Sequence, residues 1–155
     1  MTIIERFLED HTAFRKHLAD TLALARDLPE QAPPPAINDN DRAFTHRLRR
    51  HARMESELLF PAMQRAGSDD VRRQTVQQYI QHGNDEHHSV AKRQAELNSI
   101  SSGGLAAPWR LSLDHFSDGL HRHMEREEKE IFPLAQELLS PAALTELNLR
   151  ADKVL

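Results

Sequence analysis

Four long segments of this chain carry apolar residues at spacings of three and four, and these segments constrain the fold most. They cover residues 2–28, 40–66, 70–98 and 108–138, and the stretches LPEQAPPPAIND, AGSDD and NSISSGGLAAP separate them. Apolar residues at this spacing form one face of an α-helix, and clusters of Pro, Gly and Ser end it. The sequence therefore predicts four helices, each about 40 Å long at a rise of 1.5 Å per residue.

Short connections between long helices favour antiparallel neighbours, so we predict an all-α, up-down-up-down four-helix bundle. A short C-terminal helix is expected from Pro141, because the first turn of a helix tolerates proline. Pro61 and Pro133 lie near the ends of the second and fourth helices, where we expect them to kink or begin to terminate these helices. The 155 residues suffice for one core, and we assign residues 1–155 to a single domain.

Composition limits the kinds of site and partner. The chain has no cysteine, which excludes disulfides, Cys-ligated zinc and a thiol nucleophile. A net charge of −4 gives no electrostatic reason to expect nucleic acid as a partner, and the basic cluster HRLRRHAR is interpreted as a solvated helix face. The N-terminal MTIIERFLEDH lacks the apolar run of a signal peptide, and no segment is apolar enough to span a bilayer, so we expect a cytoplasmic protein.

The segments HARMESELLFP, from residue 51, and HMEREEKEIFP, from residue 123, repeat one pattern. Each has a histidine, a glutamate four residues later, and Phe-Pro five residues after the glutamate. Residues four apart share one face of a helix, so His51 pairs with Glu55 and His123 with Glu127. A phenylalanine precedes each histidine by seven residues on the same face. Both pairs are therefore expected on the core-facing stripe.

Ionised carboxylates on a core-facing stripe need compensation. Burying one costs several kcal/mol unless a cation or strong hydrogen bonds offset the loss of hydration. Two glutamates that face each other would also repel, and a bound metal ion would relieve both effects. Without a cation, we expect at least one of the two to have a raised pKa. Exposed ion pairs within each helix are the alternative, but they account poorly for two pairs with Phe-Pro at the same offset.

The first and third helices each offer one further inward histidine. His11 and His87 both have apolar residues at helical offsets on either side, which places them on the buried stripe. Each follows an acidic residue and precedes an apolar residue three positions on, so the chain looks like a duplicated helix pair. The result is a set of six candidate metal ligands without sulfur: His11, His51, Glu55, His87, His123 and Glu127. Imidazole and carboxylate suit iron or manganese, shared glutamates can bridge two cations, and zinc is chemically possible.

His11, HARMESELLFP, Glu86-His87 and HMEREEKEIFP resemble the hemerythrin-like family of His-His-Glu cation-binding domains, over about residues 2–138. The resemblance implies a four-helix bundle around a non-haem di-iron centre. It also implies two histidines for each iron and two bridging glutamates: His11 with His51, His87 with His123, and Glu55 with Glu127.

The third helix departs from the pattern of oxygen-carrying hemerythrins, which place a second histidine four residues before the one that matches His87. Here that position is Gly83, which we expect to leave room for water or an exogenous ligand, with Tyr79 nearby. His82 would need a π-bulge to reach the metal. Glu128 lies at the spacing where oxygen carriers place a bridging aspartate, so it remains an alternative to the glutamate before it.

We therefore predict a metal-binding module, a binding protein in preference to an enzyme, that binds or senses O2, NO or iron itself through a di-iron site. Its partners would be metal ions and a small diatomic ligand. The first alternative is a di-metal carboxylate enzyme that acts on peroxide or nitric oxide, which an open coordination position permits. The second is a helical interaction protein that binds no metal. The sequence specifies neither the substrate of such an enzyme nor an oligomeric state.

Overall fold

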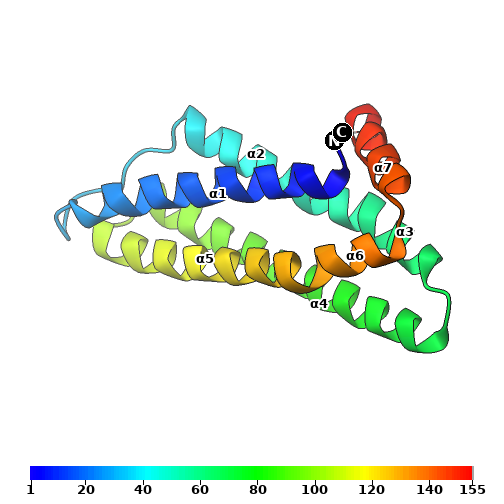
Figure 1. Cartoon of the computed structure of the whole chain (residues 1–155). Helices are drawn as coiled ribbons and strands as arrows, with labels where there is room; N and C mark the ends of the chain where they lie inside the picture. Colours follow the sequence, from blue (N-terminus) through cyan, green and yellow to red (C-terminus); the bar gives the residue numbers. More distant parts are fainter. Residues whose placement is uncertain (155) are drawn as a thin grey trace.

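The computed structural model describes residues 1–154, which fold into four long helical rods and one short helix. The rods are α1 (Ile3–Arg26), α2 (Asp39–Met54) with η1 (Glu55–Leu59) and α3 (Phe60–Ala66), α4 (Asp70–Ser101), and α5 (Ala106–Arg126) with η2 (Glu127–Ile131) and α6 (Phe132–Leu138). Consecutive rods run in opposite directions in Figure 1, which confirms the all-α bundle. The short helix, α7 (Pro141–Val154), starts at the expected proline.

Capping residues fix where the first two rods begin. Thr2 and Glu5 form a capping box at α1, and Asn38 and Asp41 form another at α2. In each box the first side chain accepts a backbone N–H from the third residue of the helix, and the acidic side chain accepts the N–H of the capping residue. These bonds satisfy donors that lack a partner within the helix.

The second and fourth rods each contain one π-helical turn, which begins at the glutamate of the repeated pattern. The backbone N–H of Phe60 donates to the carbonyl of Glu55, five residues back, and Phe132 makes the same bond to Glu127. The hydrogen bond of a π-turn spans five residues, one more than the hydrogen bond of an α-helical turn. Such turns are frequent at functional sites. The extra residue changes which side chains face the core beyond each glutamate.

Pro61 and Pro133 were expected to kink or begin to terminate their helices, and the structure shows that both rods continue past the proline. Each proline lies in the first turn of a further α-helical segment of seven residues. A proline ring has no N–H and clashes with the carbonyl four residues back. The wider π-turn immediately before each proline is where the rod accommodates this disturbance, and the helix then continues.

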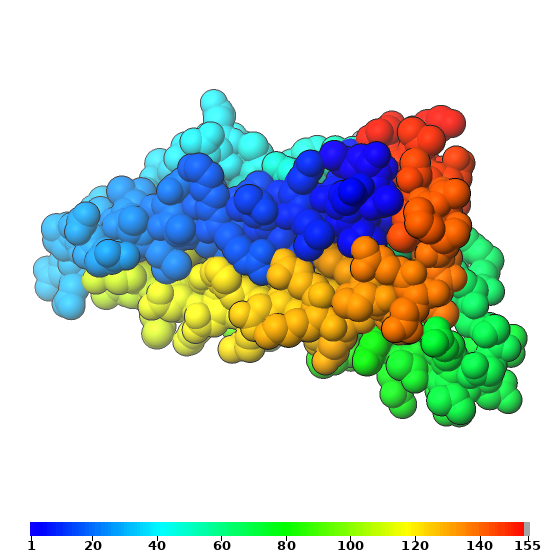
Figure 2. Space-filling model, in the orientation of Figure 1, coloured from blue at the N-terminus to red at the C-terminus, as the bar shows by residue number. Residues whose placement is uncertain are grey.

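Apolar side chains fill the bundle on both sides of the repeated His-Glu pairs. One cluster contains Phe7, Met54, Phe60 and Phe132, and the other contains Phe14, Leu48, Phe116 and Met124. The short helix α7 adds Leu144, Leu147 and Ala151 to the first cluster and covers that end of the bundle (Figures 1 and 2). Within residues 1–154, no helix combines the length and the apolar character that crossing a membrane requires.

Candidate metal centre

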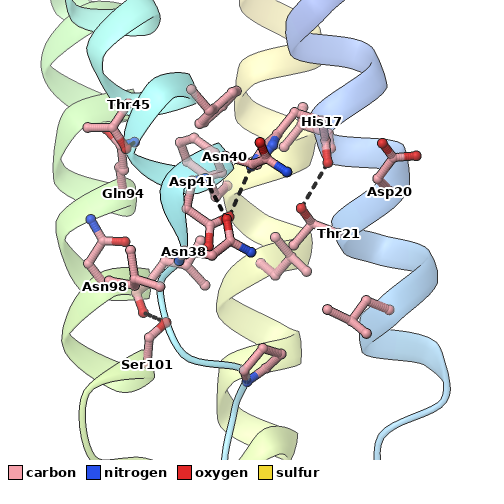
Figure 3. A pocket seen from close by; sticks show the side chains of 18 of the residues that line it. His17, Asp20, Thr21, Asn38, Asn40, Asp41, Thr45, Gln94, Asn98 and Ser101 are labelled. Atoms are coloured by element: carbon pink, nitrogen blue, oxygen red, sulfur yellow. Dashed lines mark hydrogen bonds and ion pairs between the residues drawn. The ribbon is translucent and has the colours of Figure 1, made fainter.

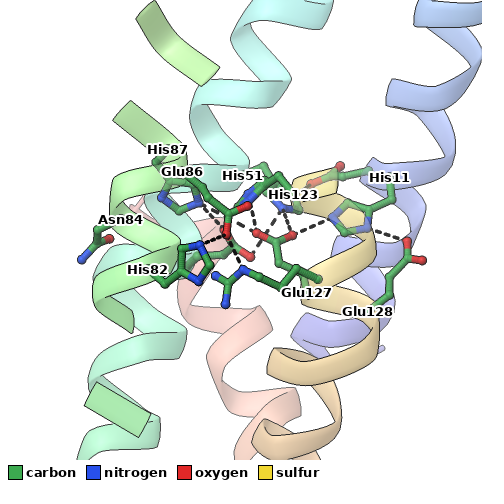
Figure 4. A network of polar contacts seen from close by, with 12 residues as sticks. His11, His51, His82, Asn84, Glu86, His87, His123, Glu127 and Glu128 are labelled. Carbon is green, nitrogen blue, oxygen red and sulfur yellow. Dashed lines mark hydrogen bonds and ion pairs between the residues drawn. The ribbon is translucent and has the colours of Figure 1, made fainter. Parts of the chain in front are cut away.

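The structure brings all six candidate ligands together between the two apolar clusters. Figure 4 shows the four histidines converging with Glu127. The ligand atoms of the six residues form two groups, and all the atoms of a group lie within 4.8 Å of one another. The groups are Glu55, His87, His123 and Glu127, and His11, His51 and Glu127. The histidines are thus divided as the family resemblance implies, and Glu127 belongs to both groups.

The carboxylate of Glu127 lies between the two pairs of histidines and is fully buried. Its Oε2 is 3.0 Å from Nε2 of His11 and 3.6 Å from Nε2 of His51. Its Oε1 is 2.5 Å from Nε2 of His123 and 3.9 Å from Nε2 of His87. One oxygen therefore faces each pair.

Glu55 is also fully buried and spans the two groups from the opposite rod. Its Oε2 is 2.8 Å from Nε2 of His87, and its Oε1 is 3.6 Å from Nε2 of His51. Each glutamate thus has one oxygen toward each histidine pair, although only Glu127 belongs to both ligand groups.

Three buried atoms in this centre lack a hydrogen-bond partner: Nε2 of His51, Oε1 of Glu55 and Oε1 of Glu127. The short distance between Glu127 and His123 is not an exception, because the two groups are not aligned for a hydrogen bond. Buried polar atoms without partners destabilise a fold by about 1–3 kcal/mol each. Cations would satisfy all three, and imidazole nitrogens with carboxylate oxygens suit iron, manganese or zinc. The residues therefore fit the metal centre.

Carboxylates on neighbouring helices orient two of the histidines. Asp10 lies 3.0 Å from Nδ1 of His51 and accepts a 2.5 Å hydrogen bond from Arg47. Because a carboxylate only accepts, Nδ1 of His51 carries the proton and Nε2 is left to face the centre. Glu86 lies 3.1 Å from Nδ1 of His123 in the same way.

A third carboxylate, Glu128, orients His11. Its Oε1 lies 2.8 Å from Nδ1 of His11 and 2.8 Å from a guanidinium nitrogen of Arg15. Glu128 therefore lies behind the histidine, on the side away from the centre, while Glu127 provides the carboxylate that reaches both groups. Arginines also accompany the other two carboxylates, since Arg126 donates to Glu86.

Sequence reasoning did not assign these orienting roles. The Asp-His and Glu-His dipeptides carried a signal, but the acid bonds the histidine of the next helix: Asp10 bonds His51, and Glu86 bonds His123. The interpretation of HRLRRHAR as only a solvated face was incomplete, because Arg47 bonds Asp10.

The charges of the centre stabilise one another, and the expectation of a raised glutamate pKa is wrong for Glu127. Burial alone would raise its pKa, but His123, His11 and His51 hold the pKa of Glu127 well below its ordinary value. Conversely, burial alone would lower the pKa of His123, but Glu127 and Glu86 raise the pKa of His123 to about 10. These three imidazoles thus offset, at Glu127, the repulsion expected between two carboxylates.

His82 and Tyr79 do not reach the centre, and the space beside Gly83 is not open. The side chain of His82 is 62% exposed, with Nε2 3.5 Å from Glu86, and no π-turn interrupts α4. Tyr79 packs against the first apolar cluster. The space expected beside Gly83 is filled, because a Cβ there would lie 3.2 Å from the ring of Phe60 and 3.4 Å from Arg126.

The sequence model of the hemerythrin HHE cation-binding domain matches residues 2–135. The chain belongs to this family. No curated protein and no solved structure matches the chain. As a hemerythrin HHE domain, the protein is a cation-binding domain, and its grouped His and Glu side chains are suited to hold the metal.

Proposed function

We propose that this hemerythrin HHE domain binds two iron ions and, through them, a small diatomic ligand such as O2 or NO, as a binding or sensing protein. His11 and His51 would hold one ion, and His87 and His123 the other. Glu55 and Glu127 would bridge them, completing the six-residue ligand set. The observation that carries the proposal is the shared Glu127, which has one carboxylate oxygen toward each histidine pair.

Iron would supply the redox-active cation to which a diatomic molecule can bind. The chain's own residues hold the geometry. Asp10 and Glu86 keep the protons of His51 and His123 on Nδ1, so the Nε2 atoms stay directed at the centre. The apolar clusters on both sides keep bulk water away from the carboxylates.

The proposal is tested by metal analysis of protein purified without chelator, compared with Glu55→Gln/Glu127→Gln. We expect about two iron ions per chain in the wild type and none in the double variant, whose fold should persist because the amides preserve shape. An absorption spectrum before and after NO addition then reports ligand binding. Wild-type protein that takes up no iron, or only zinc or manganese, would overturn the di-iron assignment.

A further inference from the structure

A cavity of about 230 Å³ between α2 and α4 reaches three of the candidate ligands, His51, His87 and His123. Most of its remaining wall is small or apolar: Leu48, Ala52, Val90, Ala91 and Ala95. Ala91 and Ala95 are also exposed at the surface. The cavity therefore connects solvent with the histidines of the centre along the seam between the two helices.

The repeated halves of the chain explain why the cavity lies on this side. The third residue after the inward histidine is Phe14 in α1 and Val90 in α4. The fourth is Arg15 in α1 and Ala91 in α4. Between the two repeated His-Glu patterns, Met124 of α5 corresponds to Ala52 of α2. At each of these positions the seam between α1 and α5 carries the larger side chain. Figure 2 shows α1 and α5 in contact along their shared length.

The polar cover over His11 also lacks a counterpart over His87. Glu128 bonds both His11 and Arg15, and the residues that correspond to this pair are Ser56 and Ala91. The His11 side chain is 0% exposed, whereas that of His87 is 14% exposed. Small residues therefore leave one of the two corresponding histidines accessible.

A second cavity, of about 200 Å³, adjoins the first but does not reach the ligands (Figure 3). The two share Gln94 and Asn98. The Gln94 amide donates a 3.0 Å hydrogen bond to the hydroxyl of Thr45, which holds this buried side chain as a wall between them. The α2–α4 seam, and not the second cavity, is thus the direct way to His87.

We propose that the α2–α4 seam is the entry route by which small neutral molecules reach the centre, on the side of His87 and His123. This inference rests on the proposed function, because the molecule that enters would be its diatomic ligand. The mostly apolar wall supports neutral molecules, since an ion would lose hydration along it, and besides the histidines Arg49, at the exposed rim, is the one ionisable side chain among the described residues of the lining. On the opposite seam, Phe14, Met124 and the Glu128–Arg15 pair close the corresponding path.

Two double variants give the α2–α4 seam the side chains that the α1–α5 seam has at the corresponding positions. Ala52→Met/Val90→Phe fills the seam with the residues of the other half, and Ser56→Glu/Ala91→Arg copies the Glu128–Arg15 cover. Ala19→Arg, at an exposed alanine of α1 that lines neither cavity, is the control. Iron content, NO association and dissociation rates by stopped flow, and xenon binding to metal-stripped protein by ¹²⁹Xe NMR are measured for each.

We expect unchanged iron content and, in both seam variants, association and dissociation rates that fall together by about tenfold or more, because a side chain must move before passage. The NO affinity of Ala52→Met/Val90→Phe should stay constant, since a barrier slows both directions equally. Xenon, which enters apolar cavities, should bind the wild type and Ala19→Arg but not the filled variant.

Each other outcome is decisive. Iron-loaded variants with wild-type NO rates would overturn the entry route and leave the proposed function intact. Equal slowing in Ala19→Arg, or an affinity change with an unaltered dissociation rate, would also overturn the route. Wild-type protein without iron would overturn the proposed function, and the route with it.

Discussion

The His11–His51 half and the His87–His123 half of the centre are alike in their inner residues and different behind them. In each half, two Nε2 atoms face the carboxylates of Glu55 and Glu127. Carboxylates bond Nδ1 of His11, His51 and His123, but among residues 1–154 no carboxylate bonds Nδ1 of His87. Carboxylates thus lie at both ring nitrogens of three histidines, but only at Nε2 of the fourth, His87.

This difference separates two requirements of the same centre. The proposed binding of two cations needs the same ligand types on both sides, and the two halves of the sequence agree in their histidines and glutamates. Exchange of a small molecule needs freedom on only one side, and there the halves differ: Glu128 corresponds to Ser56, and Arg15 to Ala91. Four predictions follow from the comparison, in decreasing order of effect.

The largest effect is expected at the residue that the halves share. Glu127→Gln should remove both ions, because the carboxylate faces both histidine pairs, whereas Glu55→Gln should retain more metal on the His11–His51 side. Metal analysis and competitive chelation measure the loss. Glu57→Gln, at an exposed glutamate of the same π-turn, should keep the wild-type metal content. Full occupancy in Glu127→Gln would show that this residue is a structural partner of the histidines.

A smaller effect is expected at the carboxylates behind the histidines. Asp10→Asn should weaken the His51-side ion and Glu86→Gln the His123-side ion, each by about 10–100-fold in affinity, because the imidazole loses its fixed proton position. The change is measured by metal titration of each variant. Asp20→Asn, at an exposed carboxylate paired with Lys16, serves as control. Equal weakening of both ions by either variant would remove the distinction between the halves.

The third prediction concerns pH. In metal-stripped protein, the pKa of His123 is raised from 6.5 to about 10 by Glu127 and Glu86 against the effect of burial. Its contribution to stability is therefore complete below about pH 6.5 and lost as pH rises through about 10. Urea unfolding at pH 6, 8 and 10 should show decreasing stability, and His123→Gln should flatten the trend. Metal occupancy should change in the opposite direction, because protons compete with the metal for imidazole. Stripped protein equally stable at pH 6 and pH 10 would contradict the first part.

The smallest effects are expected at histidines outside the centre. Variants of four of them to alanine should leave metal content unchanged: His17, His46, His82 and His121. His17 stacks on Phe44, and His82 is largely exposed. In contrast, His51→Ala and His123→Ala should lower metal content, as mass spectrometry of the intact protein would show. Loss of metal in both sets would contradict the assignment of the inward faces.

Helical spacing was sufficient to predict the convergence of the six candidate ligands. The phase of a helix relates His51 to Glu55 directly, and antiparallel packing of apolar faces brings the rods together. The tolerance of a helix's first turn for proline also predicted the short helix at Pro141. These features depend on local periodicity and on burial, which the sequence carries by itself.

Contacts between helices were harder to predict. The bond from Asp10 to His51 depends on the axial offset of α1 and α2, which no local pattern contains. The π-turns at Glu55 and Glu127 looked like ordinary helix until the structure showed the five-residue hydrogen bonds. The filled space beside Gly83 depends on Phe60 and Arg126, which come from two other rods.

The position of Glu127 in the chain also determines when a metal site can form during synthesis. His11, His51 and Glu55 leave the ribosome first, but both ligand groups include Glu127, which lies near the end of the fourth rod. Domains generally fold as units, and the first helix pair alone presents an incomplete set of candidate ligands. Both ligand groups therefore become complete only after most of the chain has been translated.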